Sequence, residues 1–295
     1  MKYLLLLVPI FSVLASCSST TPTRLSIVSA SAGSDMQHII NVSSYDPKER
    51  QRSGRSFSEN NVSSLKDNGA TALIARAGKG GNLDDKCAAF IASADRVGML
   101  PGLYYRVQKQ VDPVKQADQF VDRAISLARG RRWDAPALLL CGDYDGDLPL
   151  SSILRFMDRV ESRTGVIPVA YLENSDEMKL RTARADRKTR IRLRRAPYWL
   201  ALYSHTSGAG PTSSSQQDTP RGLLDQYRLW NDWSLWQYGG VDWERGRSRP
   251  KVYSHDRYQF DRYFGNMDRP VERNVFRGSE SDLSAFWQRH GLKLQ

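Results

Sequence analysis

The stretch Leu138-Leu139-Leu140-Cys141-Gly142-Asp143-Tyr144-Asp145-Gly146-Asp147 joins an apolar run to a cluster of carboxylates. The apolar run predicts a buried strand, and alternate residues of a strand face the same way. Asp143 and Asp145 are therefore expected to project together at the carboxyl end of the strand. Two carboxylates held close together repel, so one of them tends to keep its proton. The stretch thus predicts a strand that ends in a pair of groups suited to acid–base chemistry.

Three interpretations of these carboxylates stay open on the residues alone. One acid and one base at the same pH are what cleavage of a glycosidic bond requires. Asp-x-Asp-Gly-Asp is also compatible with a cation such as calcium, although the twelve-residue calcium loop ends in Glu and Leu154 stands at that position. The third interpretation is a solvated acidic turn.

Short apolar runs recur along the chain, with longer segments of helical spacing between them, and no internal repeat is found. The alternation predicts an α/β fold, either a parallel β/α barrel, which we favour, or a doubly wound sheet. Clear helical segments are Asp84–Val97, Pro113–Ala128 and Leu150–Arg163. The expected strands are His38–Val42, Ala72–Ala77, Pro101–Tyr105, Ala137–Cys141, Val166–Leu172, Tyr198–Tyr203, Ser234–Tyr238 and Val271–Phe276. Two long loops are expected over Ser204–Arg221 and Gly239–Pro270.

The first residues are typical of an export signal. Residues 1–16 hold one charge, Lys2, and an apolar run too short to span a bilayer. The run ends in Leu14-Ala15-Ser16-Cys17, which resembles the cleavage and lipidation site of bacterial lipoproteins. Cys17 is thus the expected lipid-anchored residue, with a Ser/Thr-rich tether over 17–37, a barrel over 38–280 and a C-terminal helical tail over 281–295. A plain secretory leader is the alternative.

Composition and charge narrow the class of protein. The 295 residues are 40% hydrophobic and 25% charged, which is ordinary globular usage and excludes collagen-like, coiled-coil and wholly disordered chains. The net charge of +11 is concentrated in Arg181–Arg195, which has eight basic residues and one Asp. A solvated helix face or a contact with an anionic envelope polymer is favoured there over nucleic acid. Whether Cys87 and Cys141 pair is left open.

The order of segments resembles glycoside hydrolase family 25, the Chalaropsis-type lysozymes. The resemblance covers about residues 38–280 and implies a modified β/α barrel in a single domain. The closing segment, Val271–Phe276 (VERNVF), resembles a family strand that usually reads Val-Asp-x-Asn-x-Phe. The other matching segments are Ile40–Tyr45, Leu73–Gly80, Asp84–Phe90, Ala94–Tyr105, Gln116–Phe120, Leu140–Asp145, Val166–Tyr171, Tyr198–Tyr203 and Leu235–Tyr238.

The resemblance implies site residues position by position. Asp145 falls where the family has its general acid/base Glu, and Asp143 falls on the Asp partner. Asn41 and Glu272 stand where the family has supporting Asp residues. Because Asp145 is shorter than Glu, and a misplacement of about 1 Å can cost roughly 100-fold in rate, the altered carboxylates bear directly on activity. The aromatic residues expected to line the sugar cleft are Tyr105, Trp236 and Tyr238.

The resemblance therefore implies a lysozyme-type muramidase, which cleaves the β-1,4 bond between N-acetylmuramic acid and N-acetylglucosamine in peptidoglycan. The resemblance implies no cofactor and no metal. The expected partners are peptidoglycan strands and, through the lipid on Cys17, a membrane. No binding of nucleic acid is expected, and the protein is expected to be a monomer. The expected location is the bacterial envelope, at the outer membrane facing the periplasm. The alternative is a catalytically impaired peptidoglycan-binding lipoprotein on the same fold.

Overall fold

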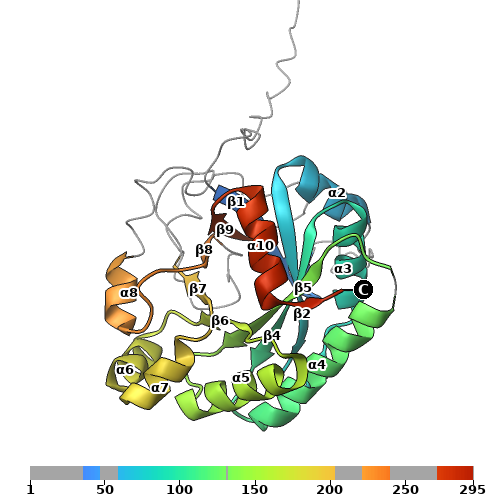
Figure 1. The fold of residues 1–295 in the computed structure, drawn as a ribbon. Coiled ribbons are helices and arrows are strands. Elements are labelled where there is room, and N and C mark those ends of the chain that lie inside the picture. Colours follow the sequence, from blue (N-terminus) through green and yellow to red (C-terminus); the bar gives the residue numbers. More distant parts are fainter. Residues whose placement is uncertain (1–35, 47–58, 131, 203–220, 240–270, 295) are drawn as a thin grey trace, which may run out of the picture.

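A closed barrel of eight strands forms the centre of the molecule (Figure 1). The computed structural model describes residues 36–46, 59–130, 132–202, 221–239 and 271–294. The barrel strands are β1 (Met36–Val42), β2 (Ala70–Lys79), β4 (Leu100–Val107), β5 (Ala137–Tyr144), β6 (Val169–Leu172), β7 (Tyr198–Ala201), β8 (Leu235–Gly239) and β9 (Glu272–Arg277). Two short strands, β3 (Asn82–Leu83) and β10 (Gly291–Lys293), pair with β2 and β5.

The barrel closes because β1 pairs with β2 on one side and with β9 on the other. Seven of the barrel strands run in the same direction. The eighth, β9, runs antiparallel to both of its neighbours, β1 and β8. The expectation of a parallel barrel is therefore corrected at its last strand. The reversal matters for the site, because it brings the first residue of β9, Glu272, opposite Asn41 near the carboxyl end of β1.

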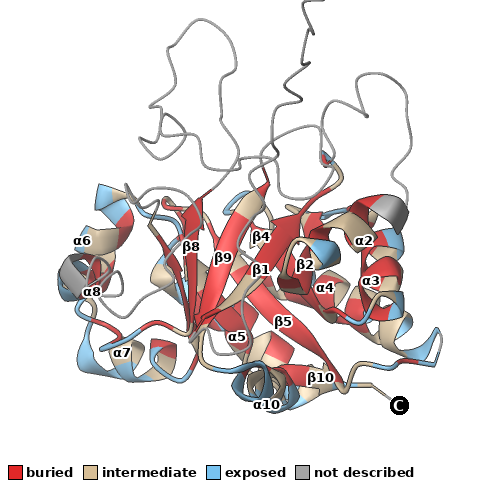
Figure 2. Cartoon of the chain, turned by 90° about the horizontal axis from the view of Figure 1, so that it is seen from above, coloured by how far each residue is buried: buried red, intermediate tan, exposed pale blue. Residues whose placement is uncertain are grey.

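Two apolar layers follow from the alternation of side chains along the strands. Inward-facing residues, such as Ile74, Leu139 and Trp199, form an inner cluster within the barrel. Outward-facing residues, such as Leu73 and Leu140, pack against the helices in a second cluster. The strands are buried on both faces in Figure 2, which explains why they are continuous apolar runs in the sequence.

Helices cover the outside of the barrel (Figure 1). The Asp112 side chain accepts hydrogen bonds from the amides of Val114 and Lys115, and Pro113 opens the helix after it. Gly165 ends the next helix with φ 71°, a left-handed conformation that favours glycine. The helices are α2 (Glu59–Asp67), α3 (Cys87–Arg96), α4 (Pro113–Arg129), α5 (Leu150–Thr164), α6 (Asp176–Arg184), α7 (Arg187–Leu193), α8 (Arg221–Tyr227) and α10 (Glu280–His290).

The base of the barrel is sealed by α10. Leu283 and Trp287 enter the inner cluster, and the Trp287 indole donates a hydrogen bond of 2.7 Å to the Pro101 carbonyl. β10 then pairs with the first residues of β5, and Figure 2 shows α10 and β10 together at the lower end. The residues expected to form a helical tail, 281–295, are therefore part of the barrel domain as far as Leu294.

The two cysteines are separated by the barrel wall. Cys87 lies on α3 in the outer cluster, and Cys141 lies on β5 in the inner cluster. Both are buried and free, so the alternative of two separate thiols is the correct one. Burial raises the pKa of the Cys87 thiol to about 12. Among the described residues, no helix is both long and apolar enough to cross a membrane.

Candidate active site

The carboxyl end of β5 brings Asp143 and Asp145 to the mouth of the barrel. Asp143 continues the inward-facing series of Leu139 and Cys141, and it is only partly exposed. Asp145 follows the last strand residue and is 16% exposed. Its carbonyl accepts a hydrogen bond from the amide of Leu148, which forms the turn beyond the strand. The structure thus brings the two sequence-predicted carboxylates to the same strand end.

Arg106, on the neighbouring strand β4, is paired with these carboxylates. Its Nε lies 2.7 Å from Oδ1 of Asp145, and its backbone lies opposite Asp143 in the β4–β5 register. Although burial alone would lower the pKa of Arg106, the charges of Asp143 and Asp145 raise it above its usual value. Arg106 is therefore a permanent cation that is ion-paired with Asp145.

Asp143 lies in a different electrostatic environment. Burial, together with the charges of Asp145 and Glu272, raises its pKa to about 7, although Arg106 acts in the opposite direction. The neutral carboxyl group of Asp143 is thus present near neutral pH. A carboxyl group that is partly protonated near neutral pH and an ion-paired carboxyl group stand at the same strand end, which suits general acid catalysis beside a developing positive charge.

Asn41 and Glu272 meet across the β1–β9 pair. The Asn41 side-chain amide donates a hydrogen bond to the Glu272 carboxylate, and Asn41 Oδ1 accepts one of 2.7 Å from Asn274. Gln237, on β8, donates to the same oxygen at 3.2 Å. Asn41 is therefore fixed on both sides of its amide, and Glu272 is held at the mouth as a hydrogen-bonded carboxylate.

A layer of polar and aromatic side chains, which the sequence analysis did not find, supports this network. The Tyr171 hydroxyl donates to Gln237 at 2.7 Å, and the Trp199 indole donates to Asn274 at 2.8 Å. Tyr104 packs edge-on against Trp199, and burial and the charge of Glu272 raise the pKa of its phenol well above the usual value. They come from five different strands, β4, β6, β7, β8 and β9, and no motif in the sequence marks them as one group.

The expectation that Tyr105, Trp236 and Tyr238 line a sugar cleft is not met by their positions. Tyr105 and Trp236 are fully buried in the outer cluster, and Tyr238 is 5% exposed there. The Tyr105 hydroxyl donates to Gln119 on α4 at 2.6 Å, and the Trp236 indole donates to the Leu202 carbonyl. The alternation of the strands is the reason, because the inward positions belong to their neighbours, Tyr104 and Gln237.

The β2 side of the mouth is a second ion-paired wall. Arg76 Nε lies 2.8 Å from Oδ2 of Asp84, and both side chains are largely buried. The same carboxylate oxygen accepts the backbone amide of Ser44, and the Arg76 guanidinium lies 5.2 Å from the ring centre of Tyr45. Tyr45 is 51% exposed, so it is an aromatic surface available to a ligand at this end of the barrel.

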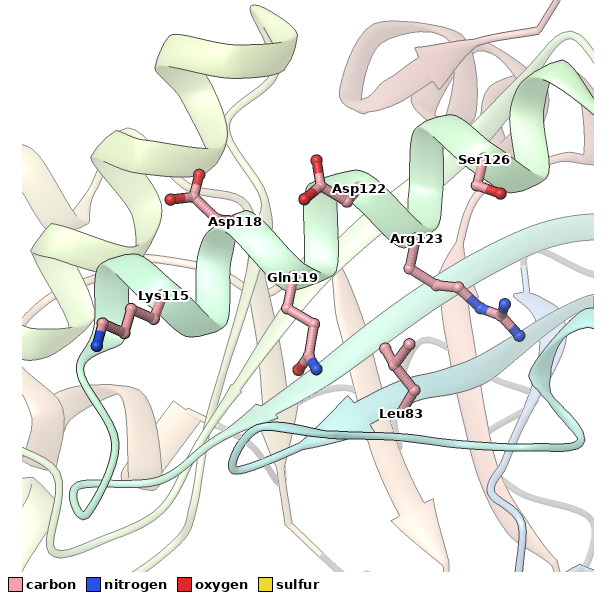
Figure 3. A pocket seen from close by; sticks show the side chains of 7 residues that line it. All are labelled: Leu83, Lys115, Asp118, Gln119, Asp122, Arg123 and Ser126. Carbon is pink, nitrogen blue, oxygen red and sulfur yellow. The ribbon is translucent and has the colours of Figure 1, made fainter.

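A separate hollow of about 490 Å³ lies outside the barrel, between α4 and the β2–β3 hairpin (Figure 3). Its carboxylates are engaged by arginines of α5, since Asp118 pairs with Arg159 and Asp122 with Arg163. It shares no lining residue with the barrel mouth. Within the described segments, no group of three His, Cys, Asp or Glu side chains is placed to hold a metal ion. Cys17 and the two expected loops lie, wholly or almost wholly, outside these segments.

Comparison with known proteins identifies the class. Two carboxyl groups in unequal environments are compatible with cleavage of a glycosidic bond, and residues 55–243 match the family described as "Glycosyl hydrolases family 25". The chain belongs to this family and is a glycoside hydrolase. No curated protein matches the chain.

Solved structures share the fold at low sequence identity. A bacterial lysozyme from Streptomyces coelicolor is 20% identical with a TM-score of 0.55, over 86% of this chain and 98% of the other. A muramidase from Acremonium alcalophilum is 16% identical with a TM-score of 0.53, over 85% and 99%. The spore cortex lytic enzyme SleM from Clostridium perfringens is 18% identical with a TM-score of 0.55, over 84% and 69%.

Proposed function

We propose that this glycoside hydrolase is a muramidase, which cleaves the β-1,4 bond between N-acetylmuramic acid and N-acetylglucosamine in peptidoglycan. Membership of family 25 supports the reaction class, and the lysozyme and muramidase that share the fold support the substrate. The observation that carries the proposal is the unequal environment of Asp143 and Asp145 at the barrel mouth.

The unequal environments favour roles opposite to those that the sequence resemblance implies. Asp143, with its raised pKa, is suited to protonate the glycosidic oxygen as the bond to the sugar carbon breaks. Asp145, paired with Arg106, is suited to stabilise the positive charge that develops on the sugar ring. A water then adds to the sugar carbon, and the proton that it loses restores Asp143. Glu272, held by Asn41, adds negative charge beside this pair.

The test is incubation of the protein with purified peptidoglycan, followed by measurement of reducing ends and released muropeptides. The expected product ends in reducing N-acetylmuramic acid, and Asp143→Asn and Asp145→Asn each abolish most of its release. Folded protein that sediments with peptidoglycan but yields no reducing ends would contradict the proposal. That result would support the alternative of a binding protein, which the pairing of Asp145 with Arg106 makes worth testing.

We further propose that the protein is anchored in the bacterial envelope through a lipid on Cys17. The apolar stretch before Cys17 and the Ser/Thr-rich stretch after it support this location. Expression with a radiolabelled fatty acid is expected to label the wild type, and Cys17→Ser is expected to lose the label and leave the membrane fraction. Cys87→Ser is the matched control, because Cys87 is buried within the fold. Unlabelled wild-type protein would overturn the anchor.

A further inference from the structure

The charge of the chain is concentrated on one side of the barrel, over α6 and α7. Residues 181–195 hold eight of the basic residues and one acidic residue, which is a net charge of +7 out of +11 for the whole chain. The two helices are joined by Ala185 and Asp186 only, and Figure 1 shows them at the same edge of the molecule.

Part of this charge is used within the fold. Arg192 pairs with Asp158 and Arg195 with Glu161, which ties α7 to α5. Arg181 donates to the carbonyls of Gly146 and Leu148, in the turn after Asp145. Arg194 donates to the backbone carbonyls of Leu229 and Arg228, so four of the eight basic residues have partners within the fold.

Four other basic residues have no such partner. They form no ion pair with any other residue that the structure describes, and the one acidic residue of the segment, Asp186, is used to cap α7 through Thr189. Two exposed aliphatic side chains accompany them, Leu180 at 49% and Ile191 at 52% exposure. We call these six side chains the basic face: Leu180, Arg184, Arg187, Lys188, Arg190 and Ile191.

The helical spacing brings charge and apolar surface together. Leu180 and Arg184 are four residues apart on α6, and Arg187 and Ile191 are four apart on α7, so each pair shares one side of its helix. The opposite sides are docked on the protein through Met178 and Leu193, which are fully buried. Each helix therefore turns one apolar side inward and a mixed cationic and aliphatic side outward.

We propose that the basic face binds the surface of an anionic phospholipid bilayer. Cationic side chains gain roughly 1 kcal/mol each near such a surface, and exposed aliphatic side chains between them reach the boundary of the acyl chains. Nucleic acid is less well matched, because single strands bind through aromatic side chains on which bases stack. The large apolar side chains exposed on this face are aliphatic.

The test is sedimentation of the full chain with vesicles of phosphatidylethanolamine and phosphatidylglycerol, compared with vesicles of phosphatidylcholine. The wild type and every variant carry Cys17→Ser here, so that the proposed lipid does not bind the vesicles itself. The basic-face variant replaces Arg184, Arg187, Lys188 and Arg190 by Gln. The matched control replaces four exposed basic residues elsewhere, Lys115, Arg129, Arg132 and Arg289, by Gln. Both variants lose the same charge and keep residues 1–35, so their difference measures the basic face alone.

The basic-face variant is expected to bind the anionic vesicles at least about tenfold more weakly than the control, with a loss of the salt dependence. The double variant Leu180→Ser and Ile191→Ser is expected to weaken binding without removing the salt dependence. It tests the same face independently, in case the fourfold variant does not fold. Equal binding by the fourfold variant and its control would overturn the proposal. So would equal binding of the wild type to both kinds of vesicle, or tighter binding of polyuridylate that the basic-face variant loses.

Discussion

Arg106 Nε lies 2.7 Å from Oδ1 of Asp145, so an ion pair joins the carboxyl ends of the neighbouring strands β4 and β5. The same guanidinium lowers the pKa of Asp143, which burial and the other carboxylates raise. A single arginine thus acts on both candidate catalytic groups. Replacing it, or either carboxylate, is expected to change the pH dependence in a direction that these charges fix.

Asp143→Asn is expected to lower turnover by roughly 10²–10⁴-fold, because it removes the proposed proton donor. A nitrophenyl glycoside of the same sugar needs little protonation of its leaving group, so the variant is expected to keep a larger share of its activity on that substrate. Asp145→Asn is expected to lose activity on both substrates. If instead Asp145→Asn keeps activity on the nitrophenyl glycoside and Asp143→Asn loses it, Asp145 is the proton donor and the proposed assignment is wrong.

Asp143→Asn is also expected to stabilise the fold at alkaline pH. The pKa of Asp143 is about 7 in the folded protein, which is above its value of about 3.9 in an unfolded chain. The folded state therefore pays an ionisation penalty that grows from about pH 4 to pH 7 and is complete above it. The free energy of unfolding of the variant should exceed that of the wild type by roughly 2–4 kcal/mol at about pH 8, and should approach it below about pH 4. Urea unfolding at several pH values measures this difference, and a difference independent of pH would contradict it.

Arg106→Gln is expected to move the alkaline limb of the pH–rate profile upward. The Arg106 charge lowers the pKa of Asp143, so its loss lets Asp143 keep its proton to higher pH. The fold is also expected to lose roughly 1–3 kcal/mol, because the Asp145 carboxylate is left without its partner. The control is Lys109→Gln, whose pair with Asp147 is half exposed and is expected to contribute less than about 1 kcal/mol.

Asp145→Asn is expected to move the alkaline limb of the residual activity downward. The negative charge of Asp145 raises the pKa of Asp143, so its removal lets Asp143 ionise at a lower pH. The measurement is the pH dependence of initial rates at high enzyme concentration, with the Arg106→Gln profile beside it. Shifts of both variants in the same direction would contradict the proposed electrostatic arrangement.

Trp287→Ala is expected to destabilise the barrel by roughly 3–5 kcal/mol. The Trp287 side chain is fully buried at the base and donates to the Pro101 carbonyl, so the change leaves both a cavity and an unpaired carbonyl. Gln288→Ala is the control, since that neighbouring side chain is exposed. Thermal unfolding followed by circular dichroism measures both, and equal melting temperatures would contradict the role of α10 as the seal of the barrel.

The sequence predicts the barrel well where periodicity is strong. All eight expected strands lie on barrel strands, and Pro113–Ala128 and Leu150–Arg163 fall on α4 and α5. The antiparallel direction of β9 was not predictable, because an apolar run carries no sign of its direction.

Which side of each strand faces inward was also underdetermined. Tyr104 and Tyr105 are adjacent, and only the pairing of β4 with β5 shows that Tyr104 and Arg106 face the interior while Tyr105 meets α4. The carboxylates were predictable from Asp143 and Asp145, because they end a strong apolar run. Their cation was not, because Arg106 comes from a strand 37 residues earlier and meets them only through the sheet register.

The sealed base and the closing strand have a consequence for synthesis, which proceeds from the amino terminus. Asn41 meets Glu272 across 231 positions of the chain, and β10 completes the edge of β5 only after α10 has been made. Contacts so distant in sequence form late and slowly. A nascent chain that stops before β9 therefore has an open wall and an uncovered interior. Asn41 and Glu272 meet only when β9 pairs with β1. The complete site is therefore expected to form only after the whole polypeptide has been synthesised.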